Sequence, residues 1–233
     1  LATGLAIPRQ TLVLPNGDIL VAEGSGGGAP ALRPKDVIAT YIKAMGKSSV
    51  KGGNRVTLLR DADNDGRAEL RTSFITGLNA PYGLAYVDGQ IYVADQDALV
   101  RFPYREGVTR ITSPGVELLK LPSHINHHWT KSLTAGPDGS RLYVGIGSNS
   151  NVGERGMGVE QDRAVIWEID RQSGMHRTYA SGIRKPHTLA IDHRTQRLWA
   201  VVNERDELGP QLVPDYLTSV RPGAFYGWPY SYW

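Results

Sequence analysis

The sequence predicts an all-β fold, a β-propeller built from four-stranded antiparallel blades. Glycine and proline are abundant, at 27 and 14 of 233 residues. A pattern of two short apolar strands joined by a turn occurs four times along the chain, and helical spacing is scarce. These features favour many short strands connected by tight turns.

The four copies of this pattern are the strongest local signal, and they span residues 4–23, 77–95, 127–147 and 182–204. The first three carry tight-turn dipeptides, Asn16-Gly17, Asp88-Gly89 and Asp138-Gly139. Such dipeptides readily adopt the positive φ angles of a hairpin, whereas the fourth copy has a looser turn at 193–195. The turns recur about every 50–70 residues, which is typical of propellers.

Further strand candidates lie between these hairpins. Third strands are expected at 55–60, 98–104 and 164–170, and fourth strands at 70–75, 116–121 and 177–181. Only residues 34–45 have helical spacing, with Val37, Ile38, Tyr41 and Ile42 on one face. Four antiparallel strands per repeat make a propeller blade.

The predicted strands complete three blades and the inner half of a fourth, about 3.5–4 blades in all. A propeller ring closes to protect its edge strands. We therefore predict that residues 1–233 form a single propeller domain, the N-terminal portion of a longer propeller. The remaining blades would lie in a further segment or a separate chain. The alternative is a compact four-bladed ring.

Composition excludes several function classes. The net charge of +3 is scattered, without the dense basic stripe that nucleic-acid binding requires. No cysteine is present, which excludes disulfides and cysteine-based zinc sites. No apolar stretch approaches the roughly 18 residues of a transmembrane segment. Phosphate-loop and G-x-S-x-G nucleophile motifs do not occur. Because the chain starts at Leu1, a processed or trimmed N-terminus is expected.

An acidic loop follows the expected strand 55–60. It places carboxylates at positions one, three, five and nine, namely Asp61, Asp63, Asp65 and Glu69. This spacing can wrap oxygen ligands around Ca²⁺, although the twelfth position is Thr72 and the flanks are strands rather than EF-hand helices. We expect either a structural calcium site or a solvated acidic hairpin loop.

Three of the six histidines, His124, His127 and His128, lie just before the expected inner strand of the third blade. An imidazole suits proton transfer near neutral pH. A zinc site formed by His124 and His128 would require a helix, which Pro122 and the following strand disfavour. Surface or packing histidines are the other alternative.

The residues before each inner strand should meet at one rim of the propeller. They include cations, a base and an aromatic ring, namely Arg9, Gln10, Tyr82, His128, Arg184 and His187. This combination suits an anionic ligand, with Arg9 and Tyr82 as predicted cofactor contacts. Polar loops without a ligand are the alternative. The aromatic run at 225–230 either stacks on a ligand or seals a blade interface.

Three segments resemble the glucose/sorbosone dehydrogenase family, whose soluble members use pyrroloquinoline quinone (PQQ). They are residues 203–233, 127–151 and the GIRKP motif at 182–186, which is similar to the family's G-x-R-N-P motif. The resemblance implies a six-bladed propeller with PQQ and Ca²⁺ on the channel axis. It also implies that His128 is the general base and that Arg184 supports the quinone oxygen. The backbone carbonyls of Glu204 and Arg205 would then bind the calcium.

Two positions depart from the family pattern. Lys185 replaces an asparagine that contacts the quinone, and His127 replaces an aspartate beside the general base. The resemblance implies a PQQ- and Ca²⁺-dependent oxidoreductase in the periplasm or outside the cell. It would oxidise a sugar or sugar aldehyde and pass electrons to a cytochrome or quinone. The alternatives are a non-catalytic propeller that binds carbohydrate or protein and a lactonase-type propeller with a channel metal.

Overall fold

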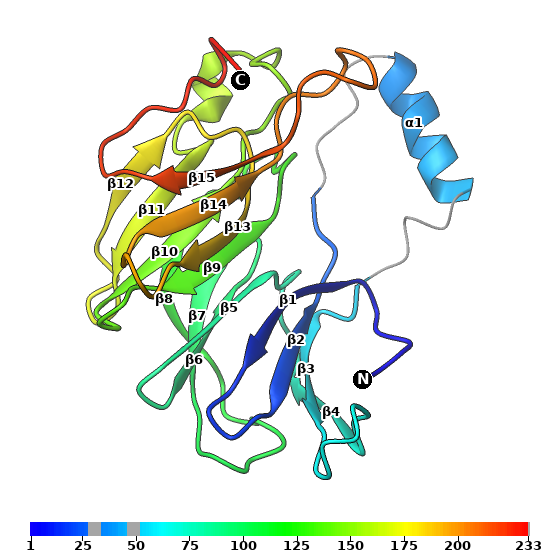
Figure 1. The fold of residues 1–233 in the computed structure, drawn as a ribbon. Coiled ribbons are helices and arrows are strands. Elements are labelled where there is room, and N and C mark those ends of the chain that lie inside the picture. The colour runs from blue at the N-terminus through cyan, green and yellow to red at the C-terminus, as the bar shows by residue number, and fades with distance from the viewer. Residues whose placement is uncertain (28–33, 46–51, 233) are drawn as a thin grey trace.

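The computed structural model describes residues 1–27, 34–45 and 52–232 of the chain. Four antiparallel sheets follow one another in sequence order, as Figure 1 shows. The predicted all-β propeller of four-stranded blades is therefore confirmed, although the fourth sheet has three strands.

Each of the first three blades runs in order from its inner strand to its outer strand. Blade one contains β1 (Pro8–Val13), β2 (Ile19–Glu23), β3 (Arg55–Arg60) and β4 (Leu70–Ile75). Blade two contains β5 (Gly83–Val87), β6 (Gln90–Ala94), β7 (Ala98–Pro103) and β8 (Val116–Lys120). Blade three contains β9 (Lys131–Ala135), β10 (Arg141–Ile146), β11 (Val165–Asp170) and β12 (His176–Ser181). Blade four contains β13 (Pro186–Ile191), β14 (Leu198–Val202) and β15 (Tyr216–Val220).

The third and fourth strands of blades one to three begin and end within one residue of their predicted bounds. The sequence prediction missed β15, so blade four extends beyond the expected inner half. The helix α1 (Pro34–Met45) also forms as predicted, and its apolar side chains Val37, Ile38, Tyr41 and Ile42 are exposed. No helix among the described residues is long and apolar enough to cross a bilayer.

Three separate apolar cores join neighbouring blades. The first unites residues of blades one and two, the second those of blades two and three, and the third those of blades three and four. Among the described residues no fourth core joins blade four back to blade one. Within the described residues the four sheets therefore lie along an arc, and a longer propeller stays a prediction.

The arc brings several loops together at one end, called here the mouth. The loops after β2, β6, β10 and β14 reach this end, and so do the segments that lead into the inner strands. One side chain crosses the channel below the mouth. The Gln10 amide donates to the carbonyl oxygens of Leu84 and Leu133, at 2.9 and 3.0 Å, and so links β1 to β5 and β9.

Candidate functional site

The histidine loop before β9 carries the predicted base at the mouth. His128 is 9% exposed, and its backbone N–H donates to the Ser148 carbonyl at 3.2 Å. Its Nδ1 lies 2.9 Å from the Ser148 hydroxyl. The His127 ring packs edge-on against it at a centroid distance of 4.6 Å. Backbone and side chain therefore both attach His128 to the loop that follows β10.

Burial keeps His128 in its neutral form. Desolvation is the largest cause of its lowered pKa, followed by the positive charges of Arg184, His127 and Lys185. An imidazole that is neutral at physiological pH can accept a proton, which is what a general base requires.

Arg184 comes from the segment before β13 and is 1% exposed. Its guanidinium donates to both the carbonyl and the side-chain oxygen of Asn151, at 3.1 and 2.8 Å. It also donates to the Glu204 carbonyl at 2.5 Å and to the Asp206 carboxylate at 2.8 Å. The backbone carbonyl of Arg184 accepts from the Ser148 N–H at 2.8 Å. His128, Arg184 and Glu204 thus gather around residues 148–151. We call these three residues, together with residues 148–151, the histidine–arginine cluster.

The segment after β14 completes this cluster with carboxylates. Glu204 is 3% exposed, and its backbone N–H donates to Asp215 at 3.0 Å. Burial raises the pKa of the Glu204 carboxyl, although it accepts a hydrogen bond from the Arg205 N–H. The Arg205 guanidinium lies over the Tyr232 ring at 5.7 Å.

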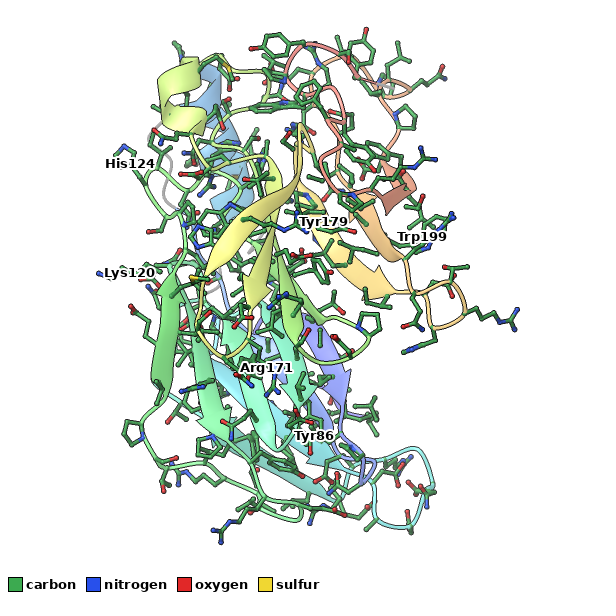
Figure 2. The ribbon with its side chains drawn as sticks, turned by 90° about the vertical axis from the view of Figure 1, so that its left-hand side faces the viewer. Tyr86, Lys120, His124, Arg171, Tyr179 and Trp199 are labelled. Atoms are coloured by element: carbon green, nitrogen blue, oxygen red, sulfur yellow. The ribbon has the colours of Figure 1, made fainter. Side chains whose placement is uncertain are left out.

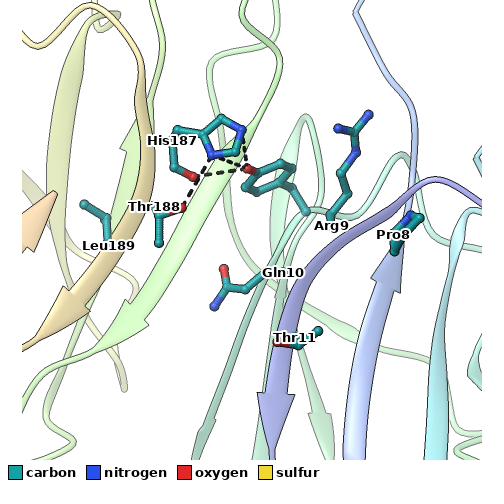
Figure 3. Close-up of a pocket in the computed structure, with 8 residues that line it drawn as sticks. Pro8, Arg9, Gln10, Thr11, His187, Thr188 and Leu189 are labelled. Carbon is teal, nitrogen blue, oxygen red and sulfur yellow. Dashed lines mark hydrogen bonds between the residues drawn. The ribbon is translucent and has the colours of Figure 1, made fainter. Parts of the chain in front are cut away.

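A pocket of about 440 Å³ opens beside the cluster, between the inner strands of blades one and four. Figure 3 shows Arg9, Gln10 and His187 around it, and Tyr82 also lines it. The Tyr82 hydroxyl lies 3.0 Å from both ring nitrogens of His187, and burial raises the pKa of Tyr82 to about 12. Arg9 lies over the Trp129 ring at 5.0 Å. We call this the channel pocket.

Lys185 connects the cluster to the channel pocket electrostatically. Burial lowers the pKa of its ammonium, and the charges of Arg184 and Arg9 lower it further. The pKa of Arg9 is lowered by burial, and that of His187 by burial followed by the charges of Lys185 and Arg9. Within the described ranges, the ammonium of Lys185 has no hydrogen bond or ion pair. Half-buried cations of this kind favour an anionic ligand.

The predicted acidic loop lies between β3 and β4, at the end of blade one away from the mouth (Figure 1). Carboxylate oxygens of Asp61, Asp63, Asp65 and Glu69 all lie within 4.8 Å of one another. The Gly66 N–H donates to Asp61 and the Ala62 N–H donates to Glu69. The structure therefore gathers the four side chains, and calcium binding there stays a prediction.

The zinc alternative is not supported by the histidine loop. His124 is exposed and points away from the propeller (Figure 2), while His128 is buried. The intervening backbone is not helical, since Ile125 and Asn126 have φ angles of 61° and 55°. In the part of the chain that the structure describes, no group of three or more potential metal-ligating side chains contains a histidine.

Sequence reasoning missed the residues that hold the cluster together. Ser148 and Asn151 come from the loop after β10, Glu160 ends the short 3-10 helix η1 (Met157–Glu160), and Arg163 precedes β11. Arg163 is 4% exposed and donates to the carbonyls of Pro122 and His128, so it clamps both ends of the histidine loop. The polar run SNSN after an apolar strand was the one available signal.

Solved structures from fungi and bacteria are similar to the chain. An iodide structure of a Trichoderma reesei family AA12 carbohydrate-active enzyme is 19% identical, with a TM-score of 0.72, and the match covers 98% of this chain and 57% of that enzyme. The holo PQQ domain of pyranose dehydrogenase from Coprinopsis cinerea is 18% identical, with a TM-score of 0.71, and the match covers 98% of this chain and 55% of that domain. The PQQ-bound aldose sugar dehydrogenase of Streptomyces coelicolor is 21% identical, with a TM-score of 0.65, and the match covers 99% of this chain and 65% of that enzyme.

These likenesses show the propeller fold, and the chain spans just over half the length of the first two structures. No curated protein matches the chain significantly. The sequence model described as Glucose / Sorbosone dehydrogenase matches residues 84–232, which include the histidine–arginine cluster. This match extends over more than half of the chain, and the protein therefore belongs to the glucose/sorbosone dehydrogenase family.

Proposed function

We propose that the chain is part of a PQQ-dependent dehydrogenase that oxidises a sugar or sugar aldehyde and passes the electrons to an external acceptor. The observation that carries the proposal is His128, a buried neutral imidazole beside permanent cations at the mouth. Two similar solved structures are described as containing PQQ. The proposed location is the periplasm or the cell exterior, where PQQ is used.

The residues at the mouth fit an anionic quinone. Arg9 and Lys185 form a half-buried positive surface beside His187, and burial lowers the pKa of all three side chains. An anion bound there would replace the water that these cations lose on burial. The donor set of Lys185 and Arg9 would hold the anionic groups, and the Tyr82 and Trp129 rings offer flat apolar surfaces.

The segment 203–206 fits Ca²⁺. The Glu204 carbonyl accepts one hydrogen bond from Arg184, which leaves its second lone pair for a cation. The carboxylates of Glu204 and Asp206 supply negative charge in this segment, as does Asp215, which accepts from the Glu204 N–H, and Ca²⁺ prefers such oxygen ligands. The backbone carbonyls of Glu204 and Arg205 are the proposed ligands.

The chemistry at the mouth divides between protein and cofactor. When bound, PQQ would supply the two-electron acceptor that oxidation of the substrate requires. His128 would take the proton of the substrate hydroxyl, since burial and then the surrounding positive charge lower its pKa and keep the imidazole neutral beforehand. Arg184 places a permanent positive charge beside the position where negative charge develops, a contribution typically worth about 3 kcal/mol.

A non-catalytic binding propeller is the second candidate. It is favoured by one observation, because the Arg184 guanidinium already donates to Asn151, Glu204 and Asp206. An arginine engaged in this way can be purely structural.

The test is dye reduction by the full-length protein with PQQ, Ca²⁺ and a panel of aldoses and sugar aldehydes. We expect turnover that a chelator abolishes. An Asp63→Asn/Asp65→Asn variant separates the two calcium sites, because loss at the acidic loop should lower the melting temperature while Ca²⁺-dependent turnover remains. Absence of both PQQ binding and dye reduction would refute the proposal, and ligand binding without turnover would support the second candidate.

A further inference from the structure

We infer that Ser148 is a positioning residue that fixes which ring nitrogen of His128 carries the hydrogen, and that Glu160 holds Ser148's acceptor in place. The catalytic consequence of this inference rests on the proposed function, whereas the tautomer itself does not. The inference concerns two residues that were not among the predicted site residues. Both are buried, with Ser148 0% and Glu160 6% exposed.

The Ser148 hydroxyl has a single hydrogen and two close polar neighbours. Its oxygen lies 2.6 Å from the carbonyl oxygen of Ser150 and 2.9 Å from Nδ1 of His128. A carbonyl oxygen cannot donate, so the hydroxyl hydrogen must point at Ser150. The hydroxyl oxygen is then left to accept from His128, which requires a hydrogen on Nδ1.

A hydrogen on Nδ1 leaves the lone pair of neutral His128 on Nε2. Free histidine in water prefers the opposite tautomer, in which Nε2 carries the hydrogen. Ser148 therefore opposes the intrinsic preference of the ring and makes Nε2 the proton-accepting atom. The backbone bond from His128 N–H to the Ser148 carbonyl, at 3.2 Å, fixes the distance between the two residues.

The Ser150 carbonyl, which accepts from the Ser148 hydroxyl, is itself held in place by a buried carboxylate. Glu160 accepts hydrogen bonds from the Asn149 N–H at 2.7 Å and from the Ser150 hydroxyl at 2.5 Å. The Ser150 hydroxyl oxygen also accepts from the Gly153 N–H at 2.9 Å. These bonds anchor Ser150 on both sides, so its carbonyl stays directed at Ser148. Glu160 thus acts on His128 through two intermediate residues.

The decisive experiment reads the tautomer of His128 by long-range ¹H–¹⁵N NMR of the protein without cofactor, above the pKa of the ring. The His128 resonance is assigned with His128→Gln. We expect a protonated Nδ1 in the wild type and in Ser148→Thr, which keeps the hydroxyl. Ser148→Ala should shift the ring toward protonated Nε2. The matched control is Ser132→Ala, since Ser132 is also buried and donates to the Pro186 carbonyl instead.

Kinetics of the loaded full-length enzyme add a second readout. Ser148→Ala should lower kcat by about 10²-fold with little change in KM, and Ser148→Thr should restore most of it, because a wrong tautomer disables a base without moving the binding groups. Glu160→Gln should give a smaller loss in kcat and a partial tautomer shift. An Nε2-protonated ring in the wild type, or an unchanged tautomer in Ser148→Ala, would overturn the inference. Absence of turnover would bear only on the proposed function, because the NMR result needs no cofactor.

Discussion

His128 and His187 occupy corresponding places before or at the start of the inner strands of blades three and four, yet their surroundings differ. Burial is the largest cause of the lowered pKa of both rings. His128 faces the Ser148 hydroxyl, whose hydrogen is already donated elsewhere. His187 faces the Tyr82 hydroxyl, which lies 3.0 Å from each ring nitrogen and 3.1 Å from the His187 carbonyl.

The difference shows that repetition of the fold places similar residues but does not give them the same chemistry. The Tyr82 hydrogen can point at a His187 ring nitrogen or at its carbonyl, so the tautomer of His187 is not determined. His187 also packs edge-on against Tyr82 at 5.6 Å. In the proposed mechanism the loop around Ser148 prepares His128 as the base, whereas His187 lines the channel pocket and packs against Tyr82.

The largest expected effect comes from replacing the base. His128→Gln should lower kcat by about 10³-fold, since general-base catalysis typically contributes 10²–10⁴-fold. KM and the melting temperature should change little, because glutamine has a similar size. Steady-state dye reduction measures the effect. A loss below about 10-fold would place the base elsewhere and remove the distinction between the two histidines.

Arg184→Lys should have the next largest effect. Lysine cannot reproduce the forked contacts with Asn151, Glu204 and Asp206, so buried acceptors lose their donors. We expect kcat to fall by about 10²-fold and the melting temperature by several degrees. Lysine keeps the positive charge that acts on His128, and His187 responds to Lys185 and Arg9 rather than to Arg184. NMR titration of both rings should therefore show no change at His187.

Lys185→Gln should raise the pKa of both His128 and His187, because the Lys185 charge lowers the pKa of each. In the wild type, activity should fall only when the pH drops through the lowered pKa of His128, below its ordinary value of 6.5. The variant should shift this acidic limb to higher pH. The free energy of unfolding changes in the same direction. As the pH falls, His128 in the unfolded chain takes up a proton near pH 6.5, whereas in the folded chain it does so only at lower pH. The folded protein therefore becomes less stable as the pH drops below that value. An unchanged limb would exclude Lys185 as an influence on the base.

The smallest expected effect is that of His187→Gln. Glutamine keeps a polar partner for the Tyr82 hydroxyl, so kcat should change by less than about 5-fold. The KM should rise, or the affinity for PQQ should fall. Cofactor titration followed by steady-state kinetics separates the two parameters. A fall in kcat comparable to that of His128→Gln would contradict the division of roles between the histidines.

The fold could be predicted because its signals are local. Asn16-Gly17, Asp88-Gly89 and Asp138-Gly139 mark hairpins, and β3, β4 and α1 form at their predicted bounds. The last strand, β15, was missed because it lies beyond the repeat, between a charged segment and an aromatic run.

The candidate site was only partly predictable. The repeat register indicated that His128 and Arg184 would meet at the mouth, and both lie against the loop 148–151. The roles of Ser148 and Glu160 depend on the path of that loop, which no sequence pattern specifies. The acceptors of Arg184 lie 19 or more residues away in sequence, so they too emerge only from the folded chain.

Gln10 has a mechanical consequence for the channel. Inner strands of neighbouring blades diverge, so their facing peptide groups lack the partners that a continuous sheet provides. The Gln10 side chain acts as a detached peptide unit, donating to Leu84 and Leu133 and lying within 3.4 Å of the Leu133 N–H that donates to it. It therefore works as a cross-brace that sets the spacing of three blades. A glutamate at this position has no amide hydrogens, so it would repel the two carbonyl oxygens and loosen the blades beneath the channel pocket.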